Sequence, residues 1–262
     1  MFELKEFCAV QSLEQADRLL HSDRKNVILG GMLWMRMGTR QFHTGIDLSQ
    51  LGLDRIKDTG DHIEIGAMTC LRQVETSPVL EENFGTIFKD AVSGIVGVQF
   101  RNLATLGGSV FSRFSFSDVS TALLVLGTRV RLYRGGDMPL SDFLETSPGR
   151  DILVSLSIPK QTIDTVYLSH RKSATDVPVL GAALARTPQG WHIALGARPS
   201  RARLAPKAAG LLPRVPDPEQ VEAACAAVQE ELGFGSNPRG SEAYRRHLAG
   251  VLIKRGVRAI CR

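Results

Sequence analysis

Two short glycine-bearing segments are the first residues of this sequence that could do chemistry. One covers residues 27–34, VILGGMLW, and the other covers residues 103–109, LATLGGS. Each places small residues after an apolar run, and free backbone N–H groups in such turns can form a concave anion-binding site. Two of these sites suit a pyrophosphate gripped from both sides. Asp118 lies nine residues beyond Ser109 and could accept hydrogen bonds from a ribose hydroxyl, although both segments could also be plain turns.

Other catalytic signatures do not occur. No G-x-G-x-x-G follows a strand, and the sequence has no Walker loop, H-E-x-x-H or G-x-S-x-G. The six histidines form no pair at metal-ligand spacing, so we predict no metal site. The four cysteines stand far apart at positions 8, 70, 225 and 261. This spacing predicts neither an iron–sulfur cluster nor a disulfide framework, as expected for a reduced, cytoplasmic protein.

Composition narrows the class of protein further. The chain has 262 residues, of which 43% are hydrophobic and 23% are charged, which is typical of globular proteins. Its longest apolar stretches, such as residues 121–127, are far shorter than the roughly 20 residues that span a bilayer. The N-terminal MFELKEF carries three charges and does not resemble a secretory signal. We therefore expect no membrane insertion.

The positive charge is concentrated late in the chain. Residues 171–262 contain 15 Lys and Arg against 7 Asp and Glu, a net charge of +8 within an overall charge of +5. Because these arginines are scattered and aromatic residues are scarce among them, we predict no nucleic-acid binding. An anionic cofactor or an acidic protein partner suits this charge better, and a merely solvated face remains the plain alternative.

Hydrophobic periodicity and capping residues position these segments in an α+β fold. Strands are expected at 27–29, 62–65, 130–133, 151–159, 177–186 and 190–195, and helices at 12–20, 70–74, 118–126, 219–232 and from 242 onward. The expected caps are Ser12, Thr69, Ser117 or Asp118, and Ser241. In the last helix, Tyr244, Leu248, Val251 and Leu252 should point inward, and Arg245, Arg246, Lys254 and Arg255 outward. Strands and helices alternate without regular βα spacing, which favours α+β in three small lobes over a doubly wound sheet.

Five segments, taken in order, resemble one family. Residues 96–127 are similar to the second FAD-binding signature of molybdenum hydroxylase flavoprotein subunits, the medium subunits of the xanthine dehydrogenase and carbon monoxide dehydrogenase family. The matching positions are Gln99, Arg101, Asn102, Ala104, Thr105, Gly107, Gly108 and Asp118. Residues 27–35 resemble the first signature, and residues 46–80, 151–159 and 237–255 resemble further family segments. The resemblance covers nearly the whole chain.

The resemblance implies a two-lobed FAD-binding domain of the molybdopterin dehydrogenase type, followed by a small α+β C-terminal domain. The first would cover residues 1–165, with lobes at about 1–52 and 53–165, and the second residues 166–262. FAD would lie extended between the lobes, with Gly30–Gly31 and Gly107–Gly108 facing each other across its diphosphate; Gly135–Gly136 would be a plain hairpin turn. The implied cofactor-binding residues are Val27, Ile28, Leu29, Gly30, Gly31, Met32, Leu33, Trp34, Thr105, Gly107, Gly108, Ser109, Asp118, Leu153 and Lys172, with Arg171 as the alternative to Lys172.

The implied activity is that of an FAD-dependent oxidoreductase subunit in a heteromeric complex. Electrons would pass from a molybdenum-cofactor subunit, through a [2Fe–2S] subunit, to FAD and then to NAD or another acceptor. No side chain of this chain need be catalytic, because the flavin carries the chemistry. Met32 and Leu33 stand where the family has a hydroxyl and a polar residue, and Arg113, Phe114 and Phe116 replace small residues. These departures keep open a degenerate scaffold subunit with weak or no FAD binding; a stand-alone FAD-dependent reductase is the other alternative.

Overall fold

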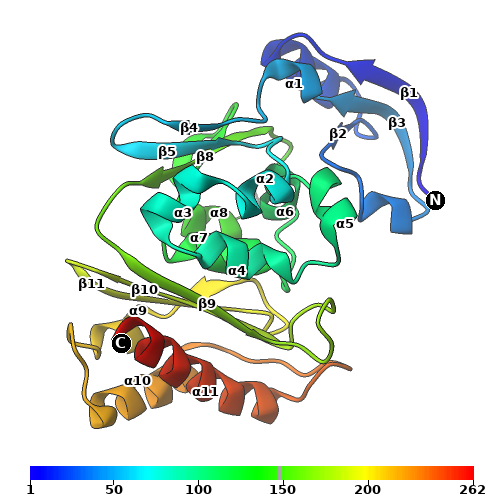
Figure 1. Ribbon diagram of the computed structural model, residues 1–262. Helices are drawn as coiled ribbons and strands as arrows, with labels where there is room; N and C mark the ends of the chain where they lie inside the picture. Colours follow the sequence, from blue (N-terminus) through cyan, green and yellow to red (C-terminus); the bar gives the residue numbers. More distant parts are fainter. Residues whose placement is uncertain (147–148) are drawn as a thin grey trace.

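Three sheets and the helices between them form the molecule. The computed structural model describes residues 1–146 and 149–262. A three-stranded sheet belongs to the N-terminal lobe, a five-stranded sheet to the middle lobe and a four-stranded sheet to the C-terminal domain. In Figure 1 these parts run from the upper right to the bottom of the view, and a layer of helices separates the second and third sheets.

The N-terminal lobe is a small parallel sheet with strand order β1-β3-β2. Ser12 caps α1 by accepting a hydrogen bond from the Gln15 backbone N–H at 3.1 Å. A cluster of buried apolar side chains that includes Val10, Ala16 and Ile46 lies within the lobe. The elements are β1 Glu3–Ala9, α1 Leu13–Ser22, β2 Val27–Leu29, the 3₁₀ turn η1 Met35–Met37 and β3 Gln41–Asp47.

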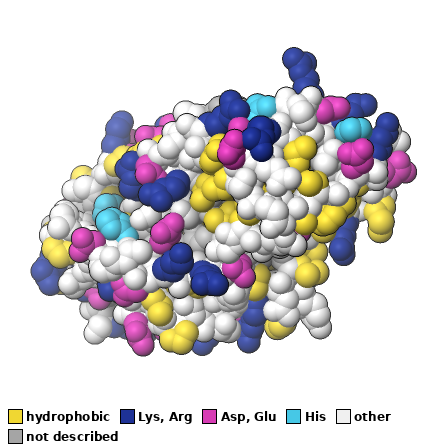
Figure 2. Space-filling model, turned by 90° about the horizontal axis from the view of Figure 1, so that it is seen from above, with side chains coloured by type: hydrophobic (Ala, Val, Ile, Leu, Met, Phe, Trp, Pro, Cys, Tyr) yellow, Lys and Arg dark blue, Asp and Glu magenta, His cyan; other side chains and the backbone are white. Residues whose placement is uncertain are grey.

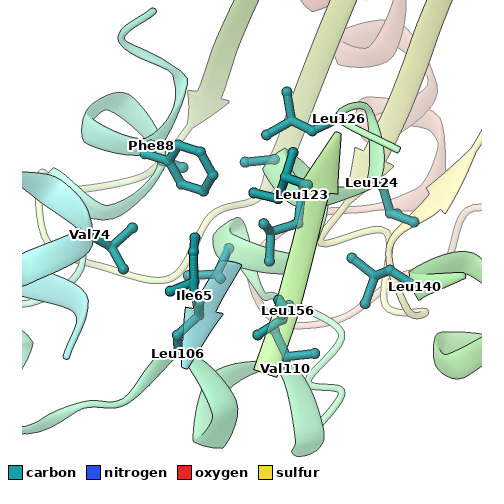
Figure 3. Packing of buried hydrophobic residues seen from close by; sticks show 14 of the residues in the cluster. Ile65, Val74, Phe88, Leu106, Val110, Leu123, Leu124, Leu126, Leu140 and Leu156 are labelled. Atoms are coloured by element: carbon teal, nitrogen blue, oxygen red, sulfur yellow. The ribbon is translucent and has the colours of Figure 1, made fainter. Parts of the chain in front are cut away.

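The middle lobe is built on a sheet with strand order β4-β5-β8-β6-β7, in which every neighbouring pair is antiparallel. Its strands are β4 Ile56–Asp58, β5 His62–Gly66, β6 Arg129–Leu132, β7 Gly136–Pro139 and β8 Leu153–Pro159. Its helical elements are η2 Ser49–Leu51, α2 Leu71–Glu75, α3 Pro78–Phe84, α4 Ile87–Ser93, α5 Val98–Leu103, α6 Leu106–Phe111, α7 Asp118–Leu124 and α8 Leu140–Glu145. Side chains from β5, β8, α6 and α7 meet in its main core, where Ile65, Leu156, Leu106 and Leu123 are fully buried (Figure 3).

The C-terminal domain is an antiparallel sheet with strand order β12-β11-β10-β9. The helices α4 and α7 of the middle lobe contact one side of it, and α9 and α11 contact it from the side drawn below it in Figure 1. The elements are β9 Asp164–His170, β10 Leu180–Thr187, β11 Gly190–Gly196, β12 Arg203–Leu204, α9 Pro206–Gly210, α10 Pro218–Glu231 and α11 Glu242–Ile260. The sheet is therefore covered on both sides, consistent with the strongly apolar β10 and β11.

The surface shows mixed charge. Figure 2 shows basic and acidic side chains interspersed on the face seen from above, with hydrophobic side chains gathered near its middle and right. No helix among the described residues is long and apolar enough to cross a membrane. The same part of the chain contains no group of three or more His, Cys, Asp or Glu side chains that could hold a metal ion.

Several predicted elements are confirmed and others are wrong. The strand Val27–Leu29, the hairpin between β6 and β7 at Gly135–Gly136, and the cap of α11 at Ser241 are present as expected. Thr69 is not a cap, because α2 begins one residue later and Cys70 caps it. In α11, Arg245 is fully buried rather than exposed, and Tyr244 is 42% exposed rather than inward. A buried arginine is tolerated there because each of its three nitrogen atoms donates to an oxygen acceptor, as described below.

Candidate cofactor site

A cavity of ≈ 760 Å³ lies among all three parts of the molecule. This volume is in the upper part of the range of about 300–1,000 Å³ that is usual for small-molecule and cofactor sites. The N-terminal lobe contributes residues 26–35, the middle lobe contributes residues around 104–119, and the C-terminal domain contributes residues 175–177. Of the predicted site residues, the cavity is lined by Val27, Ile28, Gly30, Met32, Leu33, Trp34, Thr105, Gly107, Gly108, Ser109, Asp118 and Leu153.

The turn after β2 presents unpaired backbone donors. The N–H groups of residues 31–34 donate no hydrogen bond to any residue that the structure describes. Gly31 and Met32 both have left-handed backbone angles, with φ of 69° and 60°. Successive unpaired N–H groups in such a turn form a concave site for an anion. The turn therefore fits a diphosphate through its backbone, whatever the side chains at Met32 and Leu33.

The second glycine segment forms the start of α6. Unlike the turn after β2, it uses its hydrogen-bond donors within the chain. Thr105 caps this helix, with its hydroxyl oxygen accepting from the Gly108 N–H at 3.1 Å. The N–H of Gly107 donates to the carbonyl oxygen of Ala67 at 2.8 Å, and the hydroxyl of Ser109 donates to the Thr105 carbonyl at 2.9 Å. These three donors are thus used within the chain. Here the small residues bring α6 close to the turn after β2, and the donors for an anion come mainly from that turn.

Three aromatic rings pack together in the cavity wall. Phe114 and Phe116 stack with their centroids 5.1 Å apart and their planes 9° apart, and Trp34 lies 5.3 Å from each of them. All three residues line the cavity. The residue before Phe114, Arg113, has a left-handed φ of 48°. The bulky residues at 34, 114 and 116 therefore pack on one another and also present an aromatic surface to the cavity.

Asp118 is held by two partners. Its Oδ1 accepts a hydrogen bond from Arg171 at 2.7 Å and another from the Tyr167 hydroxyl, and its side chain is 5% exposed. Burial raises the pKa of the Asp118 carboxyl, and the charge of Arg171 opposes this effect. Burial and the Asp118 carboxylate raise the pKa of Tyr167 well above its usual value, so its hydroxyl stays protonated and donates. Oδ1 is therefore committed to Arg171 and Tyr167.

Three residues of the predicted site do not line the cavity. Lys172 points away, and its Nζ donates to the carbonyl oxygen of Pro238 at 3.3 Å; Arg171 lines the cavity instead. Leu29 is buried against Gly45 of β3, since alternate residues of a strand point to opposite sides. Gly31 lies against α5, where a Cβ would stand 2.2 Å from the carbonyl oxygen of Leu103.

Charged residues that the sequence did not single out also line the cavity. They are Arg40, Arg150, Asp151, Asp176 and Arg239. Arg239 belongs to the segment 237–255 on which the family resemblance partly rested, so a signal for it was present. Nothing in the local sequence marks the others. The guanidinium of Arg150 is the most fully engaged, because it donates to the carbonyl oxygens of Leu20, Asp23, Arg24 and Asn26.

Arg101, one of the motif residues, has a structural role. It is buried and makes two hydrogen bonds to Glu75, at 2.8 and 3.1 Å, and a third to the carbonyl oxygen of Ile95 at 3.0 Å. Burial alone would raise the pKa of Glu75, but hydrogen bonds from Arg101 and Arg72 outweigh it and hold that pKa below its usual value. Arg101 thus joins α5 to α2 and fixes the segment at Ile95 that borders the cavity.

Comparisons with known proteins place this geometry in a family. Residues 2–161 match the FAD binding domain in molybdopterin dehydrogenase, and residues 165–260 match the CO dehydrogenase flavoprotein C-terminal domain. The chain belongs to this flavoprotein family. The predicted fold class and the FAD cofactor are thereby confirmed, and the chain is an oxidoreductase subunit.

Individual relatives agree over nearly their whole length. The chain is 26% identical to the nicotine 6-hydroxylase medium subunit of Paenarthrobacter nicotinovorans, over 96% of this chain and 95% of that protein. It is 27% identical to the uncharacterized protein YgfM of Escherichia coli K12, over 95% and 94%. Among solved structures, a chain of quinoline 2-oxidoreductase from Pseudomonas putida 86 superposes with a TM-score of 0.89 at 21% identity, over 98% of this chain and 96% of that one. This last likeness shows the shared fold.

Proposed function

We propose that this chain is the electron-transfer subunit of a molybdenum hydroxylase complex, and that it binds FAD in the ≈ 760 Å³ cavity. In this proposal electrons arrive from a partner subunit with [2Fe–2S] clusters, which receives them from a molybdenum-cofactor subunit, and leave to NAD or another acceptor. Residues 1–165 act as the FAD-binding domain and residues 166–262 as the C-terminal flavoprotein domain. The run of unpaired N–H groups at residues 31–34 carries the proposal, because it suits the cofactor's diphosphate.

Different residues of the chain contact different parts of the bound FAD. The backbone N–H groups at residues 32–34 donate to the diphosphate, and Gly30 and Gly108 keep the space beside it free of side chains. Arg40, which also lines the cavity, supplies positive charge toward the phosphates. Trp34, Phe114 and Phe116 give an apolar wall that excludes water from one side.

Bound FAD supplies the redox chemistry, accepting electrons one or two at a time. The chain contributes position and electrostatics. Arg171 is fixed by Asp118, and this ion pair joins α7 to the end of β9, so the C-terminal domain is held against the middle lobe at the cavity. The site is thus preorganised by contacts between elements that are far apart in the sequence.

Native co-purification tests this proposal. A tag on this chain, expressed in its own cells, should retain two partners, and the eluted complex should contain molybdenum, iron and a flavin absorbance spectrum. Colourless protein that ignores added FAD would support the degenerate scaffold instead, since the aromatic residues would then fill the cofactor's place. A yellow protein without molybdenum or iron partners would point to a stand-alone reductase.

A further inference from the structure

Two arginines of the C-terminal domain line the cavity, and they differ in how fully they are engaged. Arg171 has a side chain that is 10% exposed, and it donates to Asp118, to the Ser169 hydroxyl at 3.2 Å and to the Asp176 carbonyl oxygen at 2.6 Å. Its charge is matched by a buried carboxylate, and each of its three nitrogen atoms donates a hydrogen bond. Arg171 is therefore a structural cation.

Arg239 keeps unused donors. Its Nη2 donates to Asp176 Oδ1 at 3.2 Å, and its side chain is 41% exposed. Its Nε is buried and has no hydrogen-bond partner within residues 1–146 and 149–262. A buried N–H of a charged group is costly to leave unpaired, and such an atom in a native fold calls for a missing partner. Arg239 lines the cavity, where a bound ligand can supply that partner.

The loop that carries Arg239 is held in place by hydrogen bonds from Arg245. Arg245 of α11 is fully buried, and its guanidinium donates to the carbonyl oxygens of Val179, Gly235 and Gly240 and to Asn237 Oδ1. Asn237 Oδ1 also accepts from the Arg239 N–H at 2.9 Å. Arg245 thus ties the loop of residues 235–240 to Val179, the residue before β10. Arg239 is presented to the cavity by a rigid support rather than by a free loop.

We propose that Arg239 contacts the isoalloxazine end of bound FAD, donating its free N–H and supplying the positive charge that favours the reduced, anionic ring. This inference rests on the proposed function. The unpaired N–H groups at residues 32–34 and the Arg40 side chain serve the diphosphate from the N-terminal lobe, whereas Arg239 lines the cavity from the C-terminal domain and has a donor to spare. Because the isoalloxazine is the part of FAD that gains negative charge on reduction, a cation that the diphosphate does not use suits it.

The test uses the full chain reconstituted with FAD, and sulfite as the probe. Sulfite adds to oxidised flavin with its own electron pair, leaving the negative charge on the ring, so a nearby cation tightens its binding. Arg239→Met should raise the sulfite Kd at least about tenfold, the effect of one charge-assisted contact, and should lower the midpoint potential of the bound flavin. Arg239→Lys, which keeps the charge, should restore much of the sulfite affinity. Arg255→Gln, which removes an exposed charge from α11, is the matched control and should change neither value.

The outcomes distinguish a failure of this inference from a failure of the proposed function. Wild-type chain that takes up no FAD would defeat the proposed function whatever Arg239 does. Normal sulfite affinity and potential in Arg239→Met would overturn the inference while leaving FAD binding intact. A variant that loses FAD affinity alone, with unchanged sulfite affinity, would also overturn it, because Arg239 would then hold another part of the cofactor. Thermal unfolding of each variant checks that the fold is retained.

Discussion

Gly30 and Gly108 lie directly against each other. A Cβ on Gly108 would stand 3.0 Å from the carbonyl oxygen of Gly30, and a Cβ on Gly30 would stand 3.6 Å from Gly108 Cα. The expectation that the two glycine pairs face each other across a diphosphate is therefore wrong, since no ligand fits between them. Their bare backbones let α6 close on the turn after β2, and the cavity lies beside this contact.

This packing predicts a cost for any side chain at position 108. In Gly108→Ala the new methyl group would lie 2.9 Å from Thr105 Oγ1 and 3.0 Å from the Gly30 oxygen. The turn at 30–34 must then shift, and we expect FAD affinity to fall at least about tenfold, or 1.4 kcal/mol. Fluorescence titration with FAD measures it. Gly136→Ala is the control: its Cβ meets nothing within 4 Å, but its φ is +67°, so it should lose about 1 kcal/mol of stability and no FAD affinity.

A substitution at Met32 should relieve strain, in contrast to the one at Gly108, which adds a clash. It holds a φ of 60°, a conformation that costs an ordinary residue about 1–2 kcal/mol. Met32→Gly removes that strain and leaves the N–H groups of the turn in place. We expect FAD affinity to be kept or improved, with stability changed by less than about 1 kcal/mol because glycine also gains freedom in the unfolded chain. A large loss of FAD affinity would mean that the Met32 side chain itself holds the cofactor.

The buried ion pair between Arg101 and Glu75 should make the stability of the fold depend on pH. Arg101 and Glu75 side chains are 7% and 8% exposed, so Arg101→Met should cost about 3–5 kcal/mol in urea unfolding by leaving a buried carboxylate poorly paired. Arg72→Met, whose side chain is 41% exposed, should cost under about 1 kcal/mol. Because the folded-state pKa of Glu75 lies below its unfolded value, its contribution is present above the unfolded pKa and is lost as the pH falls through the folded pKa. The acid loss should be shallower in Arg101→Met.

Trp34 provides an optical test of the cavity wall. The chain has two tryptophans: Trp34 lines the cavity, and Trp191 is buried in the C-terminal domain, where its indole N–H donates to the Pro213 carbonyl at 2.8 Å. FAD bound in the cavity should quench the emission of Trp34 far more than that of Trp191. Trp34→Phe should therefore lose most of the quenching seen on FAD titration. Equal quenching in both proteins would place the flavin away from Trp34.

Local sequence patterns predicted the elements that depend on local chemistry. The β-branched run before Gly30 became β2, and Ser12, Ser117 and Ser241 each cap the helix that follows. Hydroxyl caps and paired glycines act over a few residues, so they can be recognised without knowing the fold. The same holds for the hairpin at Gly135–Gly136.

Tertiary contacts decided what the patterns missed. Arg245 was expected on the exposed side of its helix, because an arginine is normally solvated. Only the fold shows that the backbone oxygen of Val179, just before β10, and those of the loop before α11 surround it. The choice between Arg171 and Lys172 depends on which of two neighbours faces Asp118. Strands β1 and β9 were not predicted, since their polar residues hide the alternation that a half-buried strand usually shows.

The buried side chain of Arg245 also suggests an order for folding and FAD binding. The glycine turns come from the first half of the chain, yet the wall that carries Arg239 is complete only when α11, which follows them in the sequence, has folded against β10. The first two lobes can therefore form their sheets before α11 folds. Until then, the cavity lacks the wall that carries Arg239. We therefore expect FAD to bind after α11 has folded, and a chain trimmed before residue 242 should keep the turn at residues 31–34 but retain FAD poorly.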